Sequence, residues 1–157
     1  GFVYHEHPGW RNFNAEERNT YYVGEKYAQE INRAKIFFTC DSAYKYPLLK
    51  YFEIPASNTL LMAPESDELT DLGFIAGYNF ISIDEDDFED KAEYYLHHEK
   101  ERMEIAARGY EMVRTYHSTK RRAVDFIKTI ENLVKLAERG KACTTTSSLE
   151  QVSLGAY

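Results

Sequence analysis

Residues 36–40 read Ile-Phe-Phe-Thr-Cys, a run of β-branched and aromatic side chains that decides how the rest of the chain is interpreted. Such a run is typical of a buried strand. Before it, apolar residues recur at helical spacing over residues 20–34, and after it residues 41–47 form a turn. Helix, buried strand and turn in this order are the start of an alternating α/β pattern.

The alternation repeats twice further along the chain. Residues 58–62 (Asn-Thr-Leu-Leu-Met) and 79–83 (Asn-Phe-Ile-Ser-Ile) predict two more strands. The predicted helices after the first strand cover residues 47–53, 66–72, 88–97, 100–116 and 118–139. Strands joined through helices pair in parallel with right-handed crossovers. We therefore predict an α/β fold, a partial Rossmann-like parallel sheet of about three strands with flanking helices and a helical C-terminal region.

The length of 157 residues fits one domain with a single core. Residues 1–19 are polar and aromatic, with a turn signal at His7-Pro8-Gly9, so we predict an N-terminal loop segment there. The predicted domain covers residues 20–140. A Thr/Ser-rich run at 144–148 follows Gly140, so residues 141–157 are predicted to be a flexible tail.

Charge and cysteine content exclude several classes of protein. With 19 Lys and Arg against 26 Asp and Glu, the net charge of -7 argues against general nucleic-acid binding, and an anionic ligand must be met by local charge. Cys40 and Cys143 form no CxxC pair, so we expect neither a disulfide framework nor a zinc site, and a reducing cytoplasm fits. No stretch reads as a membrane span or a signal peptide.

The turn after the first strand is the strongest candidate for an anion site. Open α/β sheets bind ligands where the carboxyl ends of strands meet helix starts. Pro47 is predicted at the first position of the next helix, where amides and the helix dipole favour an anion such as a diphosphate. Lys45 and Lys50 add positive charge. Because no glycine-rich phosphate motif is present, the residues alone favour the alternative, an ordinary strand-to-helix connection.

Glu53 ends the same predicted short helix in an apolar setting. A carboxylate there can accept two hydrogen bonds from the cis-diol of a ribose, as acidic residues do in dinucleotide sites. The alternative is an ion pair with Lys50, three positions earlier on the same helix face. The spacing alone favours the ion pair.

Other polar groups have mainly structural interpretations. The acidic segment 84–90 and the pair His97-His98 look like metal ligands, but their spacing departs from that of a calcium loop, so we predict no metal site. Arg114 and the basic run 120–122 form either an acid-binding surface or a solvated face. His117 has no nucleophile in a recognisable motif beside it, which favours a cap or surface role over a general base.

Several short motifs occur in a fixed order along the chain. They are Lys50-Tyr51-Phe52-Glu53-Ile54-Pro55-Ala56, Asp67-Glu68-Leu69 with Gly73-Phe74, Ile105-Ala106-Ala107-Arg108-Gly109, and His117-Ser118-Thr119-Lys120-Arg121-Arg122-Ala123. With these motifs, the segment from about residue 21 to 130 resembles the donor-binding C-terminal lobe of GT-B glycosyltransferases, of the CgeB-like, group 1 type. The first motif is similar to that family's basic-x-Phe-Glu motif and the last to its His-Thr-Tyr-x-x-Arg-Ala ending.

The resemblance implies a site for a nucleotide-diphospho-sugar. It assigns Glu53 to the ribose, and it assigns the turn and helix start, with Tyr46, Pro47, Leu48 and Lys50, to the diphosphate. It implies neither a metal nor a further cofactor, because GT-B enzymes stabilise the leaving nucleoside diphosphate electrostatically.

The chain departs from the family pattern at two positions. Lys45 stands where related enzymes carry an acid, and Asn58 stands where a glycine is frequent. GT-B enzymes also bind donor and acceptor between two lobes, whereas this chain supplies about half of one lobe. The resemblance therefore implies a donor-lobe fragment of a longer transferase that lacks its N-terminal lobe, or a non-catalytic relative.

Two functions remain open from the sequence. The first is a glycosyltransferase donor lobe that binds a nucleotide-diphospho-sugar for transfer to an unknown acceptor. The second is a non-catalytic nucleotide-binding or protein-interaction module that keeps the half-Rossmann fold and self-associates or pairs its exposed sheet edge with another chain. A response to nucleotide separates the two, since an interaction module should show a large apolar patch instead.

Overall fold

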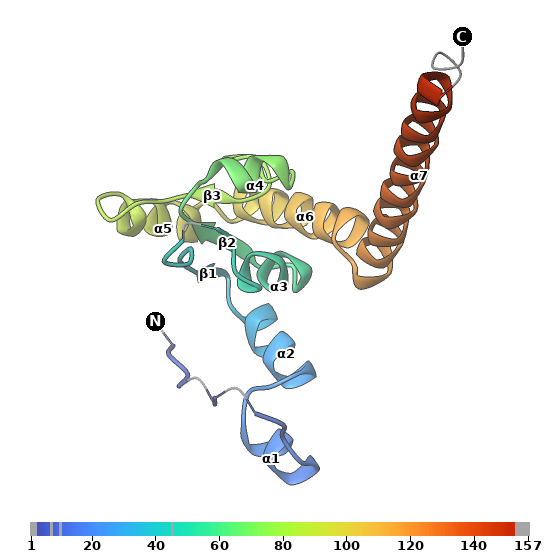
Figure 1. Ribbon diagram of the computed structural model, residues 1–157. Coiled ribbons are helices and arrows are strands. Elements are labelled where there is room, and N and C mark those ends of the chain that lie inside the picture. The colour runs from blue at the N-terminus through green and yellow to red at the C-terminus, as the bar shows by residue number, and fades with distance from the viewer. Residues whose placement is uncertain (1–2, 7, 10, 45, 153–157) are drawn as a thin grey trace. The chain divides into compact units, whose positions relative to one another are not determined.

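The computed structural model describes residues 3–6, 8–9, 11–44 and 46–152, and over residues 140–152 it describes the backbone alone. The chain divides into two compact units, Gly1–His117 and Ser118–Tyr157, which we describe separately. The first unit holds the sheet and its helices, and the second holds one long helix (Figure 1).

Strands and helices alternate in the first unit as the sequence predicts. Its elements are α1 (Ala15–Thr20), α2 (Glu25–Arg33), β1 (Ile36–Phe38), α3 (Lys50–Ala56), β2 (Leu60–Ala63), α4 (Asp67–Asp71), β3 (Ile81–Ser82), α5 (Phe88–His97) and α6 (Glu99–Tyr116). The second unit contains α7 (Thr119–Val152).

The three strands form one parallel sheet in the order β1-β2-β3. Ile36 pairs with Leu60 across the first interface, and Met62 pairs with Ile81 across the second. Each pair of neighbouring strands is consecutive in the sequence and is connected through a helix, as β-α-β units require. The predicted α/β class and the partial Rossmann-like sheet are confirmed.

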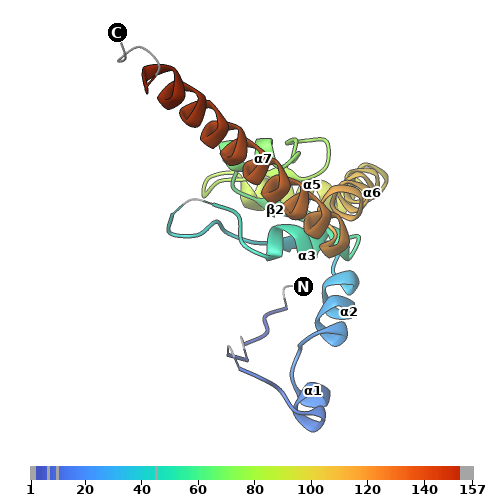
Figure 2. The same cartoon turned by 45° about the vertical axis from the view of Figure 1, so that its right-hand side comes forward.

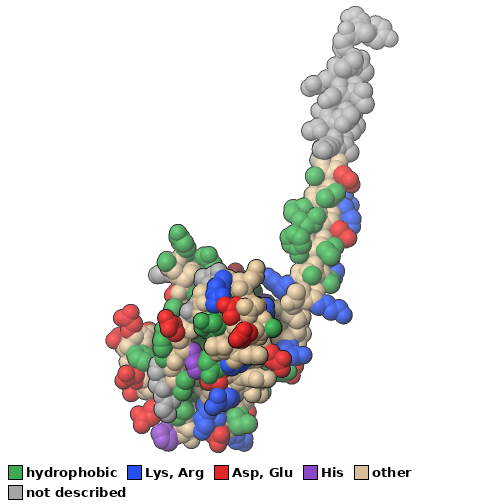
Figure 3. All heavy atoms as spheres, turned by 90° about the horizontal axis from the view of Figure 1, so that it is seen from below, with side chains coloured by type: hydrophobic (Ala, Val, Ile, Leu, Met, Phe, Trp, Pro, Cys, Tyr) green, Lys and Arg blue, Asp and Glu red, His purple; other side chains and the backbone are tan. Residues whose placement is uncertain are grey.

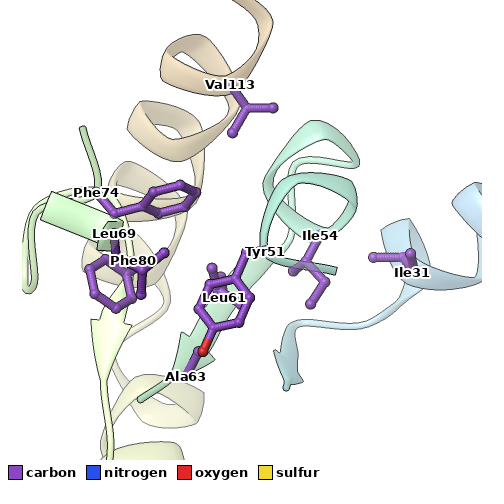
Figure 4. Close-up of a cluster of buried hydrophobic side chains, with 9 residues drawn as sticks. All are labelled: Ile31, Tyr51, Ile54, Leu61, Ala63, Leu69, Phe74, Phe80 and Val113. Carbon is purple, nitrogen blue, oxygen red and sulfur yellow. The ribbon is translucent and has the colours of Figure 1, made fainter. Parts of the chain in front are cut away.

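Alternate side chains of the central strand β2 enter two hydrophobic cores, one on each face of the sheet. Leu61 and Ala63 belong to the first core (Figure 4), whose buried residues are Ile31, Tyr51, Ile54, Leu61, Ala63, Leu69, Phe74, Phe80 and Val113. Leu60 and Met62 belong to the second core, together with Ile81, Ile105 and Ala106. Both faces of the thin sheet are therefore covered by helices.

Helix α6 contributes to both cores. Ile105 packs in the second core and Val113 in the first. Between them, Gly109 lies against the turn before β3, where an added Cβ would be 2.6 Å from the carbonyl oxygen of Asn79 and 3.4 Å from the Cβ of Pro55. Helix α6 thus crosses the amino end of the sheet at a distance that requires glycine.

Two arginines of α6 bind backbone carbonyls at this amino end. Arg102 Nη1 donates to the carbonyl oxygen of Lys35 at 3.2 Å, and Arg108 Nε donates to that of Tyr78 at 2.6 Å. Arg102 is 7% exposed, and its Nη2 lies 3.2 Å from Glu99 Oε1. Because Lys35 immediately precedes β1 and Tyr78 lies three residues before β3, the arginines fix α6 against both sides of the sheet.

The predicted N-terminal loop over residues 1–19 is wrong at its end, because α1 begins at Ala15. Asn14 Oδ1 accepts a hydrogen bond from the amide of Glu17 at 2.9 Å, and Glu17 Oε2 accepts one from the amide of Asn14 at 3.1 Å. This capping box satisfies two helix-start amides and so stabilises a helix that buries none of its residues.

Other boundaries also differ from the prediction, those of α3 and α7 among them. Helix α3 begins at Lys50 rather than Pro47, because its first hydrogen bonds are accepted by the carbonyl oxygens of Leu48 and Leu49. The backbone of α7 stays helical to Val152, within the segment that we predict to be a flexible tail, since extending a formed helix needs no new nucleus. Residues 153–157 of that tail lie outside the described residues.

Asn58 stands where a glycine is frequent in the family that this chain resembles. Its φ is +56°, in the left-handed region, which Asn tolerates better than most residues. Its amide donates to the carbonyl oxygen of Pro55 at 2.8 Å and closes the end of α3. The departure is therefore compatible with the turn.

We expect Gly109→Ala to destabilise the protein by about 1–3 kcal/mol, although alanine normally favours a helix over glycine. The carbonyl oxygen of Asn79 cannot move aside easily, because the Asn79 side chain is bonded to the amide of Ile75 and to the carbonyl oxygen of Gly73, each at 2.8 Å. Urea denaturation measures the effect. The exposed Glu111→Ala on the same helix is the control, with a change within about 0.5 kcal/mol; a Gly109→Ala protein as stable as wild type would contradict the close approach.

Candidate functional site

The carboxyl ends of the three parallel strands meet at one edge of the sheet. Loops of residues 39–49, 64–66 and 83–87 leave the strands there and lead to α3, α4 and α5. The first of these loops is the longest and projects from the sheet (Figure 2). This is the edge at which open α/β sheets bind ligands, and it carries the turn and helix start identified from the sequence.

Ser42 closes the first half of the long loop. Its Oγ accepts hydrogen bonds from the amides of Tyr44 at 3.3 Å and Tyr46 at 3.2 Å, and its amide donates to the carbonyl oxygen of Tyr46 at 3.2 Å. The exposed rings of Tyr44 and Tyr46 are nearly parallel, with centroids 6.4 Å apart. Lys45 lies outside the described residues. Tyr46 therefore offers a ring to a ligand, whereas its amide is already bonded.

The start of α3 offers fewer amides than the sequence suggests. The amide of Tyr46 is bonded to Ser42, and Pro47 has no N–H group. The amides of Leu48, Leu49 and Lys50 donate no hydrogen bond to another described residue. An anion at this point would therefore meet these three amides and the half-buried Lys50 side chain.

Glu53 lies one turn further along α3 than Lys50. Its side chain is exposed to solvent overall. Partial desolvation of the carboxyl group by the surrounding protein raises its pKa, and the positive charge of Lys50 partly opposes this shift. Burial raises the pKa of Tyr27 on α2, and the nearby Glu53 carboxylate adds to that effect. The alternative ion pair between Glu53 and Lys50 is not formed among the described contacts. The ribose role of Glu53 stays a prediction.

The loop after β3 uses its acidic side chains to bind its own backbone. Asp84 Oδ1 accepts from the amides of Asp86 at 2.9 Å and Asp87 at 3.0 Å, and Asp87 Oδ1 accepts from the amide of Asp84 at 3.1 Å. Asp87 is also bonded to Lys91, which lowers the pKa of the Asp87 carboxyl. Lys91 in turn donates to the carbonyl oxygen of Ser82 at 2.8 Å. These acids are explained by local structure.

Tyr51 connects α3 to the loop after β2, a role that sequence reasoning missed. It is fully buried, and its hydroxyl donates to the carbonyl oxygen of Pro64 at 3.3 Å. Burial raises the pKa of Tyr51 to about 12, and the nearby Asp41 and Cys40 add to the shift. The apolar spacing of α3 identifies the buried face of the helix, but no pattern identifies the hydrogen-bond partner.

His117 has the structural role that the sequence favours over a general base. Its Nε2 donates to the carbonyl oxygen of Leu72 at 2.8 Å, and its ring packs against Phe52 and Phe74. Its Nδ1 is buried with no hydrogen-bond partner in the described part of the chain. The ring joins the end of α6 to the end of α4.

Two open hollows of the first unit lie away from the predicted site residues. One, of about 480 Å³, lies between β3 and α5 and is lined by Ala76, Gly77, Ile81, Ser82, Asp90, Lys91, Tyr94 and Tyr95. The other, of about 470 Å³, is lined by residues 97–101 and Glu104. Residues 46–53 line neither hollow.

The described residues contain neither a metal-binding cluster nor a helix suited to span a membrane. No group of three or more His, Cys, Asp and Glu side chains in this part of the chain is positioned to hold a metal ion. No described helix combines the length and the apolar composition needed to cross a membrane.

The parallel sheet with helices on both faces defines a partial Rossmann-like α/β protein. Residues 3–128 match the model of the glycosyl transferase-like family. The match includes all three strands and residues 50–53, and the chain belongs to this family. Searches of curated proteins and of solved structures found no match. The glycosyltransferase part of the resemblance is thus confirmed, while the GT-B and CgeB-like assignments stay predictions.

The raised pKa of Tyr51 predicts a loss of stability at alkaline pH. A phenol with a pKa near 10 in the unfolded chain and about 12 in the folded one stabilises the fold below pH 10, and this contribution disappears as the pH rises towards 12. Wild type should lose about 1 kcal/mol more between about pH 9 and 11 than Tyr51→Phe.

Urea denaturation at several pH values measures this difference. Tyr116→Phe, which changes an exposed tyrosine, is the control and should follow wild type. Parallel curves for wild type and Tyr51→Phe would contradict the burial of the phenol.

Proposed function

We propose that the chain is the donor-binding part of a glycosyltransferase of the GT-B, CgeB-like type, and that it binds a nucleotide-diphospho-sugar. The observation that carries this proposal is the family match over residues 3–128, which includes the loop and helix start at the carboxyl end of β1. Glycosyl transfer breaks the bond between the sugar and the diphosphate. The protein must therefore hold an anion at the reacting end of the donor.

The charge of the carboxyl edge supports one location for the diphosphate. Residues 84–87 are all acidic, and α4 begins with Asp67 and Glu68, so the loops after β3 and β2 repel an anion. Lys91 is already bonded to Asp87. Lys50 forms no ion pair with another described residue, and unbonded amides precede it. The diphosphate therefore binds at the start of α3.

Glu53 is the ribose ligand of the proposed site. Its carboxylate is exposed, is not paired with Lys50, and lies one helical turn from it. In a nucleoside diphosphate the ribose is joined directly to the phosphates, so a phosphate ligand and a diol ligand one turn apart on the same helix suit the two groups. The 2′- and 3′-hydroxyls donate, and the carboxylate accepts.

Tyr46 contributes its ring rather than its amide. Its side chain is half exposed beside the proposed phosphate position, and a planar base can stack on such a ring. Stacking is tolerant of base identity, so this contact alone does not select one nucleotide.

The chemical step follows from this arrangement and needs a second component. As the sugar leaves, negative charge grows on the diphosphate, where Lys50 and the amides of residues 48–50 stabilise it, in place of a metal ion. The acceptor must be held in line with the anomeric carbon. We propose that an N-terminal lobe from outside these 157 residues supplies this positioning.

Glu53→Gln should weaken binding of a nucleoside diphosphate by about 1.5–3 kcal/mol, because a neutral amide replaces a charged acceptor. A comparison with the 2′-deoxy form of the same nucleotide measures the contribution of the ribose contact to the binding affinity. Wild type should lose affinity when the 2′-hydroxyl is removed, and Glu53→Gln should lose little more. Calorimetric titration, after a thermal-shift panel of uridine, guanosine and adenosine diphosphates, provides the values.

Glu111→Gln, an exposed change on α6, is the matched control and should bind like wild type. Equal affinity of wild type and Glu53→Gln would contradict the ribose role. No nucleotide response from any of these proteins would favour the alternative of a protein-interaction module.

The isolated chain is expected to bind the donor without transferring its sugar. Orientation of two reactants can contribute about 7–11 kcal/mol to lowering a barrier, and no acceptor is oriented here. An assay of sugar release from the bound donor tests this expectation. Steady turnover by the 157-residue chain would contradict the need for a second lobe while leaving donor binding intact.

A further inference from the structure

Helix α7 has apolar side chains along one side and charged side chains along the other (Figure 3). The apolar residues recur at intervals of three or four and form a stripe of Ala123, Phe126, Ile127, Ile130, Leu133, Val134 and Ala137. At about 100° per residue, they cover about 120° of the helix circumference. Phe126 is 68% exposed and Leu133 57%. The helix cannot bury this stripe by itself, so a second apolar surface is required.

We propose that the α7 stripe packs against the α7 stripe of a second copy of this chain, antiparallel and with Ile130 on the two-fold axis. A two-fold dimer uses one surface twice, so a self-complementary stripe is sufficient. The spacing of three and four is that of helices that pack side by side over a narrow seam.

The sizes of the side chains match in this register. Residues on the same flank and at nearly the same height face each other, and large residues then meet large ones while small meet small. The facing pairs are Phe126 with Leu133, Ile127 with Val134, and Ala123 with Ala137. The helix axes can therefore stay at a constant distance along the stripe.

The charges beside the stripe favour the antiparallel orientation. Lys120 and Glu138 lie about five helical turns apart and therefore on the same flank of the stripe. In an antiparallel pair the same flanks meet, so Lys120 of each copy faces Glu138 of the second copy. A parallel pair brings opposite flanks together and would put Lys120 beside Arg122 of the second copy.

Glu131 lies on the same flank near the centre of the stripe. Its counterpart in the second copy approaches it across the two-fold axis, so one exposed repulsion opposes two attractions. The arrangement thus contains one position at which removing a charge should strengthen the dimer.

The position of the charges also favours a protein over an anionic membrane as the occupant. A helix that lies on such a membrane carries bases on its polar face and binds through electrostatic attraction. Two lysines of α7 lie on the side opposite the stripe, and the charges beside it are of both signs, Lys120 and Arg122 with Glu131 and Glu138. A border of mixed charge attracts anionic lipid less than a basic one does.

The size of the stripe predicts a weak dimer. From Ala123 to Ala137 it is about 21 Å long, and two such helices bury less than the roughly 800 Å² per partner of a standard interface. Sedimentation equilibrium of the full chain over about 5–500 µM should therefore show a monomer–dimer equilibrium.

Substitutions on opposite sides of α7 test the surface. Ile130→Glu puts two like charges at the centre of the stripe and should raise the dimer dissociation constant at least about 100-fold. Lys128→Glu, on the opposite side of the same helix, is the matched control and should change it by less than about threefold. Circular dichroism confirms that the variants keep their helix content.

Charge reversal tests the register. Lys120→Glu and Glu138→Lys should each raise the dissociation constant by roughly tenfold, and an equimolar mixture of the two variants should dimerise like wild type, because both cross pairs are then opposite in charge. Glu131→Gln should tighten the dimer about threefold. Restoration by mixing distinguishes pairing between two copies from contacts within one chain.

Several results would overturn the proposal. They are a chain that stays monomeric over the whole range, a dimer that Ile130→Glu does not weaken, and a variant mixture that stays monomeric. A monomer that floats with vesicles of phosphatidylcholine and phosphatidylglycerol would identify a membrane as the occupant. A monomer that does not bind the vesicles would identify a surface of the same chain.

Discussion

Helix α6 and the turn before β3 approach each other so closely that no side-chain carbon fits between Gly109 and the carbonyl oxygen of Asn79. The turn is held rigid by the Asn79 side chain, which is bonded to the amide of Ile75 and the carbonyl oxygen of Gly73. A three-stranded sheet needs packing against helices to be stable. Because α6 passes the amino end at this distance, one helix reaches both cores, and the two faces of the sheet are stabilised together.

This arrangement separates the contacts that hold α6 from the proposed donor site. Arg102 and Arg108 bind carbonyl oxygens just before the outer strands, so these two contacts hold α6 at the amino end of the sheet. The carboxyl end is left to loops, among which the connection from β1 to α3 combines unbonded amides with a lysine, Lys50, that forms no ion pair with another described residue. Changes in that connection can alter a ligand site without touching the contacts that hold α6.

The elements of the fold that depend on residues close together in the sequence can be predicted from it. Alternating buried runs identify the three strands, and helical spacing puts Lys50 and Glu53 one turn apart. The second strand begins at Leu60, two residues later than predicted, because Asn58 ends α3 in the left-handed region and Thr59 bonds to the carbonyl oxygen of Ile31. The hydrogen bond from the Tyr46 amide to Ser42 and the close contact at Gly109 cannot be predicted from residue spacing. Both depend on how segments of the chain fold back on one another.

The long spans of the α6 contacts also have a kinetic consequence. Arg102 reaches Lys35 across 67 positions and His117 reaches Leu72 across 45, whereas the strand pairs join consecutive β-α-β units. Closing longer loops costs more entropy, so the strand units can assemble before α6 docks. Interactions made late in folding chiefly control the rate of unfolding. The folded lifetime of the first unit is then set by a helix that contributes no residue to the proposed donor site.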